Sequence, residues 1–103
     1  MRGAVLLYIH VQYAIMPYID VITPDTVDPG SELERIYQGI KTSRGKIAAV
    51  HTIQSLNPPT IPAHMELYRT TMFSQSPLSR GEREMMAVVV SAANGCRYCV
   101  AHH

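Results

Sequence analysis

The chain has 103 residues, 47% of them hydrophobic, and a formal net charge of +1 at pH 7. This length allows one small domain, and the hydrophobic fraction is that of a folded protein rather than a disordered one. The small charge and scattered basic residues exclude an electrostatic nucleic-acid surface, and no apolar run reaches the roughly 18 residues that span a membrane.

The first fifteen residues, "MRGAVLLYIHVQYAI", superficially resemble a secretory signal. Their apolar stretch from Ala4 to Ile9 is short, His10 and Gln12 interrupt the apolar character after it, and no small-x-small cleavage site comes next. We therefore expect a cytoplasmic protein. Because the only cysteines, Cys96 and Cys99, are three residues apart, a structural disulfide framework is excluded.

The first predicted helix comes after a loop over residues 21–31, "VITPDTVDPGS", in which prolines and a glycine favour turns. Ser31 with Glu34 three residues later forms the pattern of a capping box. Apolar residues then recur at helical spacing, which predicts a helix over residues 32–42. These residues are Leu33, Ile36, Tyr37 and Ile40.

Two further helices are predicted before residue 74. The segment "KIAAVHTIQSL", residues 46–56, has Ile47, Val50, Ile53 and Leu56 at helical spacing, which predicts a second helix. "NPP" at 57–59 interrupts it, and since proline can begin a helix but not continue one, a third helix is predicted over about residues 59–73. Its apolar face consists of Ile61, Met65, Tyr68 and Met72.

The last two predicted helices meet at a glycine. Ser79 with Glu82 forms a second capping box, and the apolar run 85–90 predicts a helix buried over most of its surface, with its methionines filling gaps in the core. Gly95 supplies the left-handed residue that ends such a helix, and a new helix is expected to begin at or near Cys96. The fold class predicted from these elements is all-α.

The final stretch, "NGCRYCVAHH", has the residues of a redox site. Since each helical residue turns about 100°, Cys96, Cys99 and His103 lie along one stripe, with His102 to the side. A thiol at a helix N-terminus is acidified by the helix dipole, and His103, one turn beyond Cys99, can accept its proton. The thiolate attacks a peroxide or a disulfide, and the second cysteine can then close on the oxidised sulfur.

Other uses of two nearby cysteines fit the sequence less well. A c-type haem site needs His directly after the second cysteine, where this chain has Val100, and a thioredoxin-like domain needs strands that are not evident. Zinc coordination by Cys96, Cys99, His102 and His103 remains open, although four ligands from one short helix would be strained. The remaining alternative is that both cysteines are small buried hydrophobic residues whose spacing has arisen by chance.

The spacing of these residues resembles a known motif. Glu84, eleven residues, Cys96-Arg-Tyr-Cys99, three residues and His103 resemble the core motif of the AhpD-like alkylhydroperoxidases, which belong to the carboxymuconolactone decarboxylase superfamily. "LSRGEREMMAVVVSAANGCRYCVAHH", with "MPYIDVITPD" and "IQSLNPP" upstream, is similar to the peroxidase-related branch. The resemblance covers residues 16–103. It implies an AhpD-like helical bundle and a thiol-dependent hydroperoxidase or disulfide oxidoreductase without a cofactor or metal.

The resemblance also implies a role for each matched residue. Cys99 would attack the peroxide, Cys96 would resolve the product as a disulfide, His103 would help ionise Cys99, and Glu84 would complete the proton relay. Tyr98 departs from the best-known members, which have a histidine there, although its hydroxyl can donate a hydrogen bond. The implied partners are a hydroperoxide substrate, a dithiol reductant and further copies of the chain in a homo-oligomer.

The resemblance implies boundaries as well. We expect residues 1–15 to be an N-terminal extension from a misassigned start, and residues 16–103 to form the N-terminal part of an AhpD-like domain through the CxxC motif. Family members continue past this motif with further apolar helices, so we expect a bundle that is incomplete at its C-terminus. A non-catalytic zinc-binding or interaction module, or an inactive fragment of the peroxidase, are the alternative functions.

Overall fold

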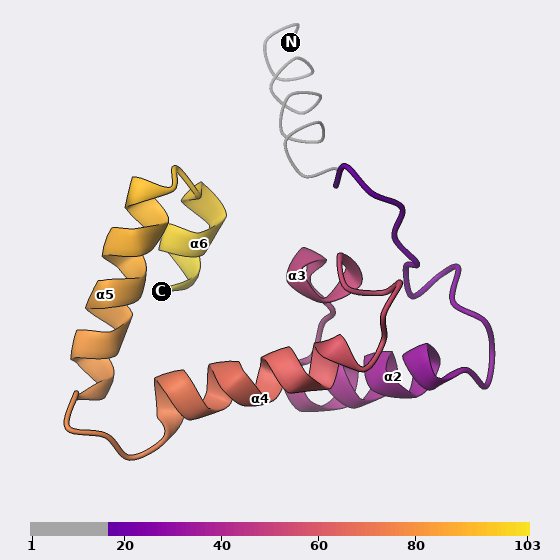
Figure 1. Ribbon diagram of the computed structural model, residues 1–103, viewed down its shortest axis with the longest axis horizontal. Helices are drawn as coiled ribbons and strands as arrows, with labels where there is room; N and C mark the ends of the chain where they lie inside the picture. Colours follow the sequence, from indigo (N-terminus) through magenta and orange to yellow (C-terminus); the bar gives the residue numbers. More distant parts are fainter. Residues whose placement is uncertain (1–16) are drawn as a thin grey trace, which may run out of the picture. The chain divides into compact units, whose positions relative to one another are not determined.

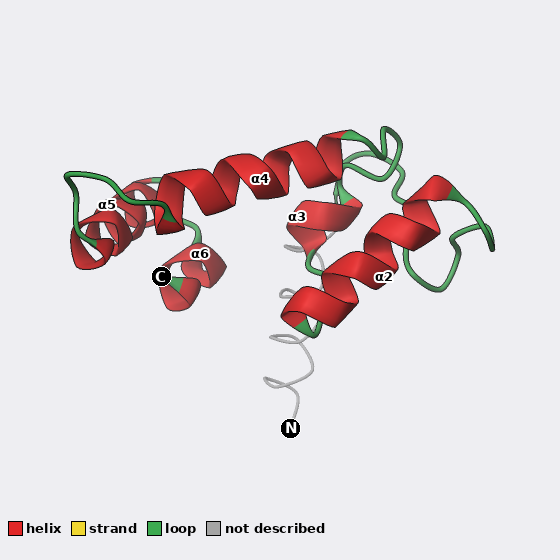
Figure 2. Ribbon diagram, turned by 90° about the horizontal axis from the view of Figure 1, so that it is seen from below, coloured by secondary structure: helices red, strands yellow, loops and turns green. Residues whose placement is uncertain are grey.

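The computed structural model describes residues 17–103, and within this range the regular elements are helices, with no strand (Figure 2). The helices are α2 (Glu32–Arg44), α3 (Ala49–Thr52), α4 (Thr60–Phe73), α5 (Arg80–Ala93) and α6 (Arg97–His102) (Figure 1). This confirms the predicted all-α class. The predicted extension, residues 1–15, lies outside the described residues.

The chain divides into two compact units, and the boundary between them falls inside α4, after Ala63. The second unit therefore contains most of α4 together with α5 and α6. None of the helices in residues 17–103 has the length and apolar character needed to cross a membrane.

Helix α2 is capped at its start by Ser31, the predicted N-cap, and at its end by a glycine, Gly45. The Ser31 hydroxyl accepts the backbone N–H of Glu34 at 3.2 Å, as predicted. The other half of the capping box differs, because the Ser31 N–H donates to the Asp28 carbonyl at 3.2 Å, and the Glu34 carboxylate accepts the N–H of Gly30 at 3.1 Å instead. Gly45, at φ 80°, ends the helix two residues later than predicted.

The core of the first unit lies between α2 and the start of α4. Its buried residues are Leu33, Tyr37, Ile40 and Ile61. The Tyr37 hydroxyl donates to the Ile22 carbonyl at 2.6 Å, and the Ile22 N–H donates to the Ser55 hydroxyl at 2.7 Å. Burial raises the pKa of the Tyr37 phenol, and its hydrogen bond with Ser55 opposes part of that shift. The loop before α2 is therefore fixed to the core by buried polar contacts.

Helix α3 is shorter than the helix predicted over residues 46–56. It begins where the Ala48 N–H donates to Nδ1 of buried His51 at 3.0 Å, and after Thr52 the chain continues in tighter turns. Ser55, held by the Ile22 N–H, donates its own N–H to the Thr52 carbonyl at 3.0 Å. Three of the apolar residues whose spacing predicted this helix are exposed: Val50, Ile53 and Leu56.

In the second unit, α5 and α6 pack against one another (Figure 1). The capping box predicted at the start of α5 is confirmed, because the Ser79 hydroxyl accepts the Glu82 N–H at 3.2 Å and the Glu82 carboxylate accepts the Ser79 N–H at 2.7 Å. The Ser79 N–H that the carboxylate accepts favours the charged form and lowers the pKa of Glu82, and the Ser79 side chain adds to the shift. Met65 and Met72 of α4 are buried, as predicted.

The predicted burial of α5 over most of its surface is wrong for this single chain. Four of its apolar side chains are between 57% and 67% exposed: Met85, Met86, Val89 and Val90. A helix that packs against one neighbour covers only the face turned toward it. The methionines of α5 therefore do not fill a core gap here, in contrast to those of α4.

Candidate active site

The cysteine pair lies where α5 turns into α6. The N–H of Gly95 donates to the Ala92 carbonyl and that of Cys96 to the Ser91 carbonyl, both at 3.0 Å. With Gly95 at φ 67°, as predicted, these bonds form the Schellman motif that ends a helix. Only glycine adopts this left-handed conformation without strain, so the turn sets where Cys96 begins the next helix.

Cys96 and Cys99 form a disulfide, with their Cα atoms 5.2 Å apart. Cys96 is the N-cap of α6, and its sulfur accepts the backbone N–H of Cys99 at 3.2 Å. Both residues are half-buried. The two sulfurs therefore face one another across the first turn of α6, which is the arrangement that reversible thiol–disulfide exchange needs.

Glu84 and His103, which lie nineteen residues apart, meet in the structure. Nδ1 of His103 lies 2.7 Å from Oε2 of Glu84, and the two side chains are only 22% and 23% exposed. Because a carboxylate is an acceptor only, Nδ1 carries the proton, and Nε2 is left to accept one when the imidazole is neutral. The contact thus fixes both the orientation and the tautomer of the ring.

Arg80 holds the other oxygen of Glu84, a contact that sequence analysis missed. Its guanidinium lies 2.7 Å from Oε1 of Glu84, donates to the Met72 carbonyl at 2.8 Å and stands 3.7 Å above the ring of Phe73. Arg80 and Glu84 are four residues apart in a helix, so the i, i+4 charge pattern was the available signal. Nothing in the sequence indicated the link to α4.

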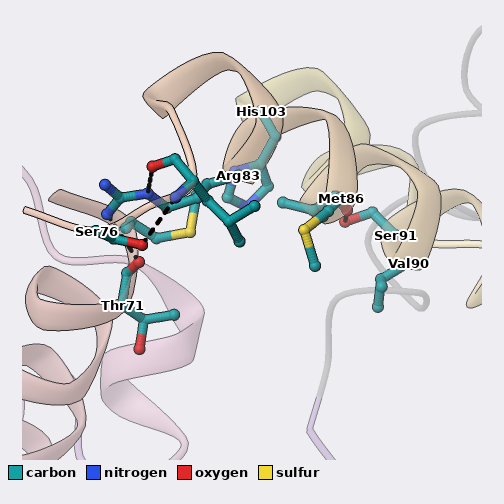
Figure 3. Close-up of a pocket in the computed structure, with 10 residues that line it drawn as sticks. Thr71, Ser76, Arg83, Met86, Val90, Ser91 and His103 are labelled. Carbon is teal, nitrogen blue, oxygen red and sulfur yellow. Dashed lines mark hydrogen bonds between the residues drawn. The ribbon is translucent and has the colours of Figure 1, made fainter.

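Arg83 fixes the connection between α4 and α5. Its guanidinium donates to the carbonyls of Thr71 at 3.1 Å, Ser74 at 2.6 Å and Leu78 at 3.2 Å. Figure 3 shows Arg83 beside Thr71. These carbonyls belong to the end of α4 and the loop after it, where no helical partner remains. Arg83 therefore secures the start of α5, from which Glu84 projects.

His103 also lines a pocket of about 410 Å³ in the second unit. Figure 3 shows the imidazole near Met86 and Arg83, with Val90 and Ser91 further along the same helix. Most of the lining is apolar, with Met72 and Leu78 completing it. His103 therefore lies beside a pocket whose walls are mostly apolar.

The four predicted site residues form two pairs in the structure. One is the Cys96–Cys99 disulfide and the other is the Glu84–His103 hydrogen bond. Within residues 17–103, no hydrogen bond joins His103 to Cys99, and none joins Tyr98 to either pair. The Tyr98 ring packs instead on His102, with centroids 4.0 Å apart.

The four ligands of the zinc alternative are not gathered at one point. The two sulfurs bond to each other, His103 contacts Glu84, and His102 contacts Tyr98. Over the described range, no three His, Cys, Asp or Glu side chains stand in an arrangement that could hold a metal ion.

Comparisons with known proteins bear on the same segment. Neither the curated proteins nor the solved structures contain a match to this chain. The model of the Carboxymuconolactone decarboxylase family matches residues 59–103, a range that includes α4, α5, α6 and every residue of the two pairs. Residues 59–103 are therefore similar to the carboxymuconolactone decarboxylase family, the superfamily that the motif predicted.

Proposed function

We propose that this protein is a thiol-dependent hydroperoxidase or disulfide oxidoreductase that works through Cys96 and Cys99. The observation that carries the proposal is the disulfide across the first turn of α6, in a chain with no other cysteine. A disulfide that closes so short a loop contributes little to stability, so its chemistry is the better reason for its presence. The family match of residues 59–103 supports an enzymatic role.

In the proposed oxidation, the Cys99 thiolate attacks the terminal oxygen of a hydroperoxide. The O–O bond breaks, the alkoxide leaves and takes up a proton, and Cys99 becomes a sulfenic acid. The Cys96 thiol then attacks the Cys99 sulfur, and one water leaves as the disulfide forms. Two electrons pass from the two thiols to the peroxide. A dithiol reductant returns them and is itself oxidised to a disulfide.

His103 and Glu84 would serve the first of these steps. A neutral imidazole held by Glu84 through Nδ1 presents Nε2 as a base, and His103 lies one helical turn beyond Cys99. In this proposal His103 takes the Cys99 proton and later delivers it to the alkoxide. Glu84, with its second oxygen on Arg80, stabilises the imidazolium formed in between.

We also propose that the protein works as a homo-oligomer. The apolar side chains exposed on α5, Met85, Met86, Val89 and Val90, support this, because large exposed apolar patches are uncommon on monomers. Sedimentation velocity measures the assembly directly. A dimer or larger species is expected, whereas a monomer at every concentration tested would contradict the proposal.

The roles of the two cysteines are tested by replacing each with serine. Cys99→Ser should abolish consumption of tert-butyl hydroperoxide. Cys96→Ser should react once per chain and accumulate a sulfenic acid that dimedone traps. Full hydroperoxide consumption by Cys99→Ser would show that the sulfur assignment is wrong. Metal analysis of the same proteins tests the zinc alternative. One tightly held zinc per wild-type chain that is lost in both variants would favour a zinc-binding module.

A further inference from the structure

A second pocket, of about 330 Å³, lies beside the disulfide at the junction of α5 and α6. Its lining residues are Ala92, Gly95, Cys96, Arg97, Val100 and Ala101. The pocket is therefore in contact with one sulfur-bearing residue, Cys96, and not with Cys99.

Helix geometry places Cys99 away from this pocket, whereas Cys96, the N-cap of α6, lines it together with Gly95 of the preceding turn. At about 100° per residue, Arg97, Val100 and Ala101 lie on one side of α6. Cys99 lies roughly 120° or more away from the middle of that side, in the direction of His103. The α6 residues that line the pocket and the Glu84–His103 pair thus belong to different faces of the same short helix.

Arg97 gives this pocket its charge. Arg97 is exposed, and none of the ion pairs in the described part of the chain involves it. The other lining side chains are small or apolar. The pocket therefore offers an uncompensated cation beside the half-buried Cys96, among side chains that are otherwise small or apolar.

We propose that this pocket is the entry site for the reductant, a thiol carrying a negative charge, and that its thiolate attacks Cys96. The attacking sulfur bonds to Sγ of Cys96, the Cys96–Cys99 bond breaks, and Cys99 leaves as a thiolate. A second thiol of the reductant then attacks the mixed disulfide, releasing Cys96 as a thiolate and the oxidised reductant. This assignment rests on the proposed function for its place in turnover. It would let peroxide and reductant approach α6 from different faces.

One contact favours the opposite direction of attack. The Cys99 N–H donates to Sγ of Cys96 at 3.2 Å, which would stabilise Cys96 as the leaving thiolate. Attack on Cys99, however, has to take place on a sulfur that this pocket does not reach. The two effects predict different products, so the direction of attack is decided by identifying the mixed disulfide.

The oxidised protein is mixed with glutathione, and free thiols are blocked at once with N-ethylmaleimide. Trypsin cleaves after Arg97, so Cys96 and Cys99 fall in separate peptides, 84–97 and 98–103. The expected result is glutathione on peptide 84–97 and the maleimide on peptide 98–103. Glutathione found mainly on peptide 98–103 would overturn the proposal.

The charge is tested with Arg97→Gln. Exchange with glutathione should slow by about 2–5-fold, the effect of one exposed ionic contact, while exchange with neutral 2-mercaptoethanol keeps its rate. Arg69→Gln, which removes an exposed arginine paired with Glu66, is the matched control and should change neither rate. Equal rates for Arg97→Gln and wild type with glutathione, or equal slowing with both thiols, would contradict the charge assignment. Because no peroxide is present, this result is independent of whether the protein reduces peroxides.

Discussion

Replacing Glu84 with glutamine keeps the size of the side chain but changes what it offers to His103. The carboxylate accepts from Nδ1 at 2.7 Å and so leaves Nε2 free to act as a base. A glutamine amide can instead donate to Nδ1, which moves the ring proton to Nε2 and removes the base. The Glu84→Gln variant should therefore oxidise more slowly even when it is fully folded.

The size of this effect can be worked out from the contact. A hydrogen bond to a charged group contributes about 1.5–3 kcal/mol, and since both side chains keep about a fifth of their exposure, solvent screening favours the lower half of that range. A loss of about 1.5–2 kcal/mol in the transition state corresponds to a rate about 10–30-fold lower.

The assay is stopped-flow oxidation of the reduced protein by tert-butyl hydroperoxide under single-turnover conditions. Glu66→Gln is the matched control, because Glu66 pairs with Arg69 on the exposed side of α4 and should leave the rate unchanged. Circular dichroism establishes that both variants remain helical. Oxidation of Glu84→Gln at the wild-type rate would refute the view that Glu84 acts through His103.

Three further predictions concern the scaffold. Tyr37→Phe removes the donor to the Ile22 carbonyl and should lower the free energy of unfolding by about 1 kcal/mol in urea titrations; an unchanged midpoint would contradict the role of that bond. The folded-state pKa of Glu82 is lowered from 4.5, so the stability that its carboxylate contributes is present above pH 4.5 and is lost as the pH falls through the folded-state pKa. The stability of Glu82→Gln should therefore depend less on pH in acid. Identical acid-unfolding profiles for the variant and the wild type would contradict this role of Glu82. Gly95→Ala, at φ 67°, should cost about 1–2 kcal/mol in thermal unfolding, and a stabilised variant would show that the turn tolerates a side chain.

Local signals predicted the helix ends well. Ser79 and Glu82 cap α5 through bonds that span three residues, and Gly95 ends it through its own backbone conformation. Such interactions depend only on neighbours in the sequence, so they can be read from it directly. The shortening of α3 could not be predicted from the sequence in this way, because it involves Ser55, whose hydroxyl accepts a hydrogen bond from the N–H of Ile22, 33 residues away.

The site was predicted in part, for a related reason. Glu84 and His103 were paired through the motif, and the structure brings them together. Arg80 was missed because its contacts to the Met72 carbonyl and the Phe73 ring depend on how the loop after α4 folds. The catalytic roles of these residues remain predictions.

The exposed face of α5 could not be predicted from its apolar run. The sequence indicates that Met85 and Val89 are suited to burial, but whether they are buried depends on which surfaces are available to cover them. Periodicity determines which residues share a face, and packing determines what that face meets.

The most direct test of the redox assignment is a thiol count on the reduced wild-type protein after one equivalent of hydroperoxide. The proposed function predicts rapid loss of both thiols of each chain and a tryptic product in which peptides 84–97 and 98–103 are joined by a disulfide. Two thiols that survive the hydroperoxide, or a single cysteine oxidised without a bond to the other, would contradict it.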